Sequence, residues 1–220
     1  MRTFGSCDVT VGYAFLTKDE LPLWPVWERY FEGCPRGSYT VAVHTQAMGE
    51  ARATLTKSIR AVGGHVVEVE DTVTGDPRFK WSMITAMFRV YRLAAETAAP
   101  GSGCTPRWLH LSSESCVPVA TCRVVHEHLR KHVGVSFLSP LQPEGAYEHT
   151  GGAQPSGYEG LMRKSSQWMT LWADHAMALV ADEEKLQASW EGVLTAWYVG
   201  QKGFAIDEYL WYPEDRKSVV

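Results

Sequence analysis

Short apolar runs alternate along this chain with longer segments of helical period, and this alternation limits the possible folds more than any other feature. The runs occupy residues 11–17, 39–44, 65–70 and 107–113. Apolar runs of this length, bounded by glycine or charged residues, are typical of buried strands. We therefore predict a sheet built from strands that lie far apart in the sequence.

The segments beside these runs have the period of amphipathic helices. In one of them, Trp81, Ile84, Phe88 and Tyr91 share a helical face. Helices are predicted over 20–33, 80–99 and 120–132. Strands that alternate with helices in this way predict a Rossmann-type α/β/α sandwich with a mostly parallel central sheet. In such sheets, ligands bind beyond the carboxyl ends of the strands.

The rest of the chain extends this pattern. Residues 166–172 are predicted to form a strand, and residues 173–199 one or two helices. Residues 140–163 are rich in Pro and Gly without a period, so this segment is either a functional loop or disordered. Neither an internal repeat nor a linker is evident, and 220 residues suit one domain with one core, over 1–220.

Composition excludes several classes of function. The net charge of −4 offers no basic excess for nucleic acid, and no apolar stretch approaches the ~18 residues of a membrane span. The first residues, "MRTFGSCDVTVGYAFLTK", differ from a signal peptide because Asp8 and Gly12 interrupt them. The chain is thus expected to be either a cytosolic protein or a soluble fragment whose anchor lies outside it.

Cysteine and histidine spacing favours neither disulfides nor a metal centre. The five cysteines form no CxxC pair, and mostly free thiols are expected, with at least one unpaired. His128 and His132 are one helical turn apart, but the zincin pattern fails because its second histidine would fall at Arg130. A solvated helix face is favoured there, and a metal-dependent hydrolase is the least favoured function.

Signatures of common enzyme classes are absent from the sequence. It has no G-x-G-x-x-G, no Walker loop and no G-x-S-x-G. It also has no Asp-x-Asp, the triplet with which metal-dependent sugar transferases hold a cation. The nearest match, residues 182–184, is expected to begin a helix, where acidic side chains interact favourably with the helix dipole.

Two segments combine polar side chains with apolar surroundings. In "HLSSESCVPV" (110–119), the serines can donate hydrogen bonds and Glu114 can accept them from sugar hydroxyls, or the serines can satisfy a turn. In "FAIDEYLWYPED" (204–215), Asp207 and Glu208 stand among apolar residues, where an ionised carboxylate is costly without a partner or a function. An acidic helix start is the alternative interpretation.

The sequence resembles the core-2/I-branching N-acetylglucosaminyltransferase family, and its plant-type branch most closely. The resemblance lies in "YAFLTKDELPLWPVWERYFEG", "YTVAVHT", "KWSMITAMFRVYRL", "LSSESCVPV", "RKSSQWMTLWADHAMAL" and "DEYLW". It implies a GT-A-type fold and inverting transfer from a UDP-sugar without a bound metal or other cofactor. It also implies that Glu208 is the catalytic base, while Asp207 caps or orients local structure.

The resemblance assigns further residues to the two substrates. Trp81 and Ser82, with Ser113 and Glu114, match positions near the donor. For the acceptor, the matching residues are Arg163, Lys164 and Trp168.

Members that work without a metal neutralise the leaving diphosphate with basic residues beyond the "DEYLW" segment. Here Arg216 and Lys217 follow that segment, and Lys18, Arg163 or Lys164 are alternatives. The expected function is therefore metal-independent, inverting transfer from a UDP-sugar to a hydroxyl of a glycan or other acceptor. The alternative is a non-catalytic protein that binds nucleotide sugars or carbohydrate on the same fold.

Overall fold

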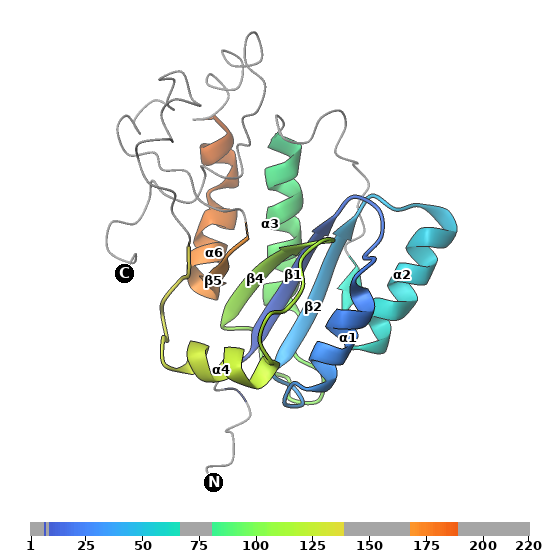
Figure 1. Cartoon of the computed structure of the whole chain (residues 1–220). Coiled ribbons are helices and arrows are strands. Elements are labelled where there is room, and N and C mark those ends of the chain that lie inside the picture. Colours follow the sequence, from blue (N-terminus) through green and yellow to red (C-terminus); the bar gives the residue numbers. More distant parts are fainter. Residues whose placement is uncertain (1–6, 8, 67–80, 139–167, 189–220) are drawn as a thin grey trace, which may run out of the picture.

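The computed structural model contains a five-stranded sheet in the order β3-β2-β1-β4-β5 (Figure 1). The structure describes Cys7 and residues 9–66, 81–138 and 168–188. The strands are β1 (Val11–Thr17), β2 (Tyr39–Thr45), β3 (His65–Val66), β4 (Trp108–Ser113) and β5 (Thr170–Trp172). β1, β2, β3 and β4 are parallel, whereas β5 runs antiparallel to β4. The predicted mostly parallel sheet is confirmed.

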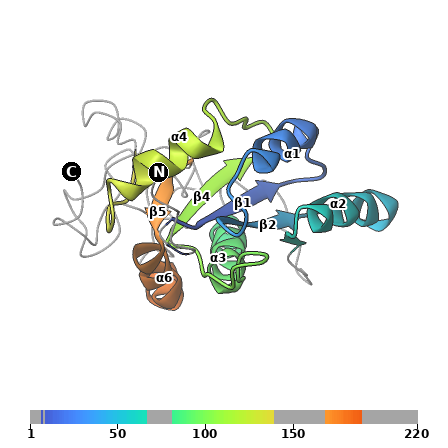
Figure 2. The same ribbon diagram turned by 90° about the horizontal axis from the view of Figure 1, so that it is seen from below.

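Helices cover both faces of this sheet (Figure 2). They are α1 (Trp24–Glu32), α2 (Gly49–Ala61), α3 (Trp81–Glu96), α4 (Cys122–Arg130) and α6 (Ala173–Ala181). In Figure 2, α1 and α4 lie on one face, and α3 and α6 lie on the other. Crossovers between parallel strands are right-handed. The crossover through α1 moves from β1 toward the β3 edge, and the crossover through α3 moves back from β3 to β4, so α1 and α3 lie on opposite faces.

Two core layers result, and the alternation of side chains along β1 divides them. Val11, Tyr13 and Phe15 pack in the layer under α1 and α4. Ala14 and Leu16 pack in the layer under α3 and α6. All seven residues of β1 are buried, so this strand has no solvent-exposed face. A strand covered on both faces is apolar throughout, as the sequence pattern indicated.

Gly12 allows α3 to lie close to β1. A Cβ at this position would lie 2.8 Å from Cδ2 of Leu109 and 3.2 Å from Cβ of Ala94, which belongs to α3. A contact of 2.8 Å is too short for two carbon atoms, so a side chain here would displace the Leu109 side chain and crowd Ala94 of α3.

The structure contains α2, a helix that the sequence pattern did not predict. Only Leu55 and Ile59 are buried along its 13 residues. α2 packs at the β3 edge of the sheet, where two apolar side chains suffice to anchor it. A stripe that narrow produces little helical periodicity in the sequence. β5 is also shorter than the strand predicted over 166–172. It begins at Thr170, and residues 168 and 169 precede it without strand structure.

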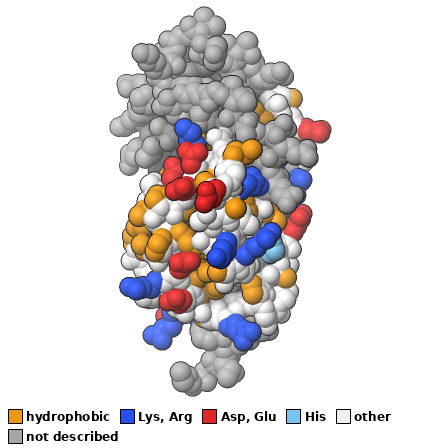
Figure 3. Space-filling model, turned by 90° about the vertical axis from the view of Figure 1, so that its right-hand side faces the viewer, with side chains coloured by type: hydrophobic (Ala, Val, Ile, Leu, Met, Phe, Trp, Pro, Cys, Tyr) orange, Lys and Arg blue, Asp and Glu red, His pale blue; other side chains and the backbone are white. Residues whose placement is uncertain are grey.

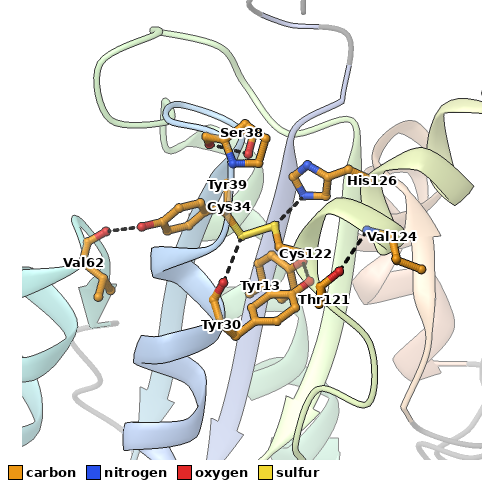
Figure 4. Close-up of a disulfide and its surroundings, with 11 residues drawn as sticks. Tyr13, Tyr30, Cys34, Ser38, Tyr39, Val62, Thr121, Cys122, Val124 and His126 are labelled. Atoms are coloured by element: carbon orange, nitrogen blue, oxygen red, sulfur yellow. Dashed lines mark hydrogen bonds between the residues drawn. A yellow bond between two sulfur atoms is a disulfide. The ribbon is translucent and has the colours of Figure 1, made fainter.

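The expectation of mostly free thiols is wrong. Cys34 is bonded to Cys122, and Cys7 to Cys104, across 88 and 97 residues of sequence. Of the described cysteines, Cys116 is free. Figure 4 shows that Cys34, just after α1, meets Cys122 at the start of α4. Sequence spacing did not predict these pairs because the sheet brings the cysteines together.

Charged side chains of both signs lie near one another on the side of the molecule that carries α2 (Figure 3). Within the described residues, no helix combines the length and apolar character needed to cross a bilayer.

Replacing both members of the Cys34–Cys122 pair with serine should lower the free energy of unfolding by about 2–4 kcal/mol, because the unfolded chain regains conformational freedom. Urea unfolding followed by tryptophan fluorescence measures this change. Cys116→Ser is the matched control and should change the free energy by less than about 1 kcal/mol. A double variant with the urea midpoint of the wild type would contradict a stabilising disulfide.

Candidate functional site

Three parallel strands end side by side at the carboxyl edge of the sheet. β1 ends at Thr17, β2 at Thr45 and β4 at Ser113. Thr17 pairs with Thr45, and Leu16 with Ser113, so the three ends are in register. The chain adds β2 and β3 on one side of β1 and then returns to add β4 on the other side. In open α/β sheets, ligands bind beyond the strand ends where the strand order changes in this way.

Threonine hydroxyls fix the loop that leaves β1. Thr17 Oγ1 donates a hydrogen bond to the carbonyl of Glu20 at 2.8 Å, and Thr45 Oγ1 donates to the carbonyl of Asp19 at 2.6 Å. The backbone N–H of Gln46 donates to the carbonyl of Lys18 at 2.8 Å. These bonds attach the Lys18–Glu20 loop to the end of β2 and hold the exposed Lys18 side chain at the carboxyl edge.

A cavity of about 420 Å³ opens beside this loop, between the start of α1 and the face of α2 that carries residues 50–58. We call it the edge pocket. Its described lining comprises Glu20, Leu21, Trp24, Glu50, Ala51, Thr54, Leu55 and Ser58. The charged members of this lining are both glutamates. Carboxylates accept hydrogen bonds from hydroxyl and N–H groups, so this pocket suits a neutral polar group and disfavours a phosphate.

His44, near the end of β2, is buried and neutral. Burial, together with the positive charges of Arg89 and Arg52, lowers the pKa of its imidazole to about 4. Within the described chain its Nδ1 atom has no hydrogen-bond partner. Arg52 belongs to α2 and Arg89 to α3, so two cations act on the end of β2 from different helices.

The serines after β4 form a hydrogen-bonded turn. Ser113 Oγ lies 3.0 Å from Ser115 Oγ, and the backbone N–H of Ser115 donates to Ser113 Oγ at 3.3 Å. The backbone N–H of Ser113 contacts Cys116 Sγ at 3.3 Å. These contacts give the Ser113 and Ser115 side chains partners within the turn. The side chain of Glu114 is half-buried at this strand end.

Trp81 and Ser82 form the first turn of α3, on the other layer of the molecule. Trp81 is a core residue with 8% exposure, packed among side chains of α3 and α6. Trp81 Nε1 and Ser82 Oγ are buried, and neither has a hydrogen-bond partner in the described structure. Figure 1 places this end of α3 beyond the carboxyl edge of the sheet, on the side where β1 and β4 end.

Trp168 lies elsewhere, on the sheet face under α1 and α4. It is 39% exposed and lines a second cavity, of about 350 Å³, with Cys116, Val117 and Pro118. We call this cavity the face pocket. Trp168, the last residue of the "RKSSQW" string, therefore lines the same wall as Cys116, Val117 and Pro118 of the "SESCVPV" string.

Sequence reasoning missed Tyr13 and His110, which line the face pocket. They are register partners on β1 and β4, and their rings lie 5.8 Å apart. Burial lowers the pKa of His110 to about 4, so its imidazole is neutral. The sequence held one indication of these two residues, because each is a polar side chain within an apolar run that was predicted to be a buried strand.

The remaining predicted site residues lie outside the described residues. They are Glu208, Arg163, Lys164, Arg216 and Lys217, together with the loop 140–163.

His128 on α4 and His132, just after the helix, contribute to packing. The rings of His128 and His132 lie 4.4 Å apart, and both contact Phe137, at 5.2 and 5.5 Å. In the described part of the chain, three side chains of types that bind metal ions lie close together, namely Cys34, Cys122 and His126. Its two sulfurs form the disulfide, and His126 Nε2 contacts Cys122 Sγ at 3.4 Å (Figure 4).

Comparison with known proteins agrees with the sequence motifs. The model of the Core-2/I-Branching enzyme family matches residues 11–208. The chain is 25% identical over 177 residues to "Glycosyltransferase BC10" of Oryza sativa subsp. japonica, a match that covers 80% of this chain and 41% of that protein. The chain thus spans about two-fifths of the length of this curated relative.

A solved structure, mouse xyloside xylosyltransferase 1 in its apo form, is similar with a TM-score of 0.41 and 9% sequence identity, over 89% of this chain and 79% of that one. The family match, by contrast, extends from the first residue of β1 to Glu208. This chain belongs to the Core-2/I-Branching enzyme family.

Proposed function

We propose that this chain transfers a sugar from a UDP-sugar to a hydroxyl group of a glycan or other acceptor, with inversion and without a metal. The observation that carries the proposal is the family match over 11–208, which includes the acidic pair Asp207 and Glu208. The carboxyl edge supports it, because three strand ends and their polar loops gather there.

In this proposal Glu208 is the general base. Its carboxylate takes the proton of the acceptor hydroxyl while the hydroxyl oxygen attacks the anomeric carbon of the sugar. The bond from that carbon to the UDP oxygen breaks on the opposite side, and UDP leaves with the bonding electrons. Inversion follows because the nucleophile and the leaving group occupy opposite faces of the sugar.

The donor is assigned to the carboxyl edge. The glutamates of the edge pocket can accept hydrogen bonds from the hydroxyl and N–H groups of a nucleoside, whereas they would repel its diphosphate. Lys18 supplies positive charge in the loop beside this pocket, and the cations of Arg52 and Arg89 act on His44 at the end of β2. Arg216 and Lys217 complete the basic set for the diphosphate, because charge-assisted hydrogen bonds stabilise a leaving phosphate.

The other matched residues are assigned to the two substrates. Trp81, Ser82, Ser113 and Glu114 are proposed to contact the donor. For the acceptor, the proposed contacts are Arg163, Lys164 and Trp168, whose indole is partly exposed and can stack against a sugar ring.

Glu208→Gln should remove transfer while the fold and UDP-sugar binding persist. The loss should be about 10²–10⁴-fold, because the amide no longer accepts the acceptor proton. Initial rates of UDP release with an acceptor present, together with calorimetric titration of the UDP-sugar, measure the two properties separately. Asp207→Asn, a change at the neighbouring carboxylate, is the matched control and should retain transfer. Full activity of Glu208→Gln would rule out this base.

The alternative function gives a different result. If the wild-type protein binds a UDP-sugar without turnover, and Glu208→Gln binds it equally well, the chain is a non-catalytic binding protein.

Chelation should leave transfer unchanged, because side-chain cations take the role of the metal. We expect equal rates of UDP release in EDTA and in Mn²⁺ at the same ionic strength. Lys18→Gln, which removes one of the proposed cations, should lower the rate in both conditions. A strict requirement for Mn²⁺ would overturn the metal-independent mechanism.

A further inference from the structure

We propose that the face pocket binds a small, uncharged aromatic compound that carries a hydroxyl group. This site shares Trp168 with the proposed acceptor contacts, and the inference does not rest on the proposed function.

The pocket has walls from two strands and two helices. Its floor is β1 and β4, and its sides are α1, α4 and the residues around β5. Residues 116–120 run across its mouth, where Val119 is 99% exposed, so the pocket lies close to solvent. The described lining comprises Val11, Tyr13, Trp27, Tyr30, His110, Leu111, Ser112, Cys116, Val117, Pro118, Val119, Ala120, Val125, Leu129, Trp168 and Thr170.

Two fixed points hold the segment over the mouth. Trp27 Nε1 donates a hydrogen bond to the carbonyl of Cys116 at 2.9 Å. At the other end, Cys122 is bonded to Cys34 beside α1. Because both ends of the segment are attached to α1, the cavity is a formed part of the fold.

The volume sets the size of the ligand. The pocket measures about 350 Å³. An engineered apolar cavity of roughly 150 Å³ holds one benzene ring, and small-molecule sites begin at about 300 Å³. A compound with two fused rings is therefore a suitable occupant.

The lining determines the charge and polarity of the ligand. Within its described residues there is no Lys, Arg, Asp or Glu, and most of the surface is aliphatic or aromatic. A diphosphate would find no cation here. A sugar would leave several hydroxyl groups without partners, and burying an unpaired hydroxyl costs roughly 1–3 kcal/mol. Flat apolar rings fit the faces of Trp27 and Tyr13 better.

One polar group in this lining lacks a partner, and this group favours a ligand that carries a hydroxyl. Ser112 is 1% exposed, and its Oγ atom forms no hydrogen bond with the described residues. It lies two residues beyond His110 on β4, so both side chains are on the same face of the sheet. A ligand hydroxyl can both donate to and accept from Ser112 Oγ, which relieves the cost of this unpaired group.

Other polar groups of the pocket have partners among the described residues. The hydroxyl groups of Tyr13 and Tyr30 are 2.5 Å apart, and His110 Nδ1 lies 2.8 Å from Thr170 Oγ1. A ligand with one hydroxyl therefore satisfies Ser112 without breaking these pairs.

Three probes test the inference by titration calorimetry on the disulfide-bonded protein. 2-Naphthol has the predicted rings and hydroxyl, naphthalene has only the rings, and 2-naphthoate carries a charge. We expect 2-naphthol to bind about tenfold more tightly than naphthalene, the ratio that one good hydrogen bond supplies. 2-Naphthoate should give no measurable heat. Failure of 2-naphthol to bind would overturn the proposal.

Variants locate the binding. Val125→Trp fills the pocket and should abolish 2-naphthol binding, whereas Val124→Trp, its neighbour on the exposed side of α4, should not change it. Ser112→Ala should reduce the affinity for 2-naphthol to that for naphthalene, and this variant covers the case in which Val125→Trp does not fold. Binding unaffected by Val125→Trp in a folded protein, or by Ser112→Ala, would contradict this site or its choice of a hydroxyl.

Discussion

The burial of β1 on both faces is the constraint on which the rest of the structure depends. Every residue of Val11–Thr17 is covered, and its backbone pairs with β2 on one side and β4 on the other. Parallel neighbours cannot be joined by a tight turn, so a helix must cross the sheet between them. α1 and α3 do so on opposite faces, and the side chains of β1 alternate between their layers. The absence of a Cβ at Gly12 lets α3 approach closely.

The same parallel arrangement separates two chemically different regions. At the carboxyl edge, the strand ends bring together Lys18, Glu20 and the serine turn, so this region is polar and charged. On the face under α1 and α4, the described lining of the face pocket carries no charge. The proposed sugar transfer needs the first environment, because a diphosphate and a proton acceptor are charged. The second environment suits an apolar ring.

The α1 and α4 layer owes its position to long-range contacts. Cys34 and Cys122 connect the end of one helix to the start of the other, and the indole of Trp27 holds the carbonyl of Cys116. Tyr13 packs edge-on against Trp27, with ring centroids 5.8 Å apart. The segment between β4 and α4 crosses the sheet face under these restraints, which is why a cavity persists beneath it.

The sequence alone determined the strand and helix alternation, the mostly parallel sheet and the family, because local periodicity and short motifs encode them. It placed Ser113 at a strand end and Trp81 on a helix. It did not predict α2, whose stripe of two buried side chains is too narrow to detect, nor the disulfides, whose cysteines lie 88 and 97 residues apart. Only tertiary structure decided that Tyr13, His110, Ser112 and Trp168 share one pocket, because strand register and loop path bring them together.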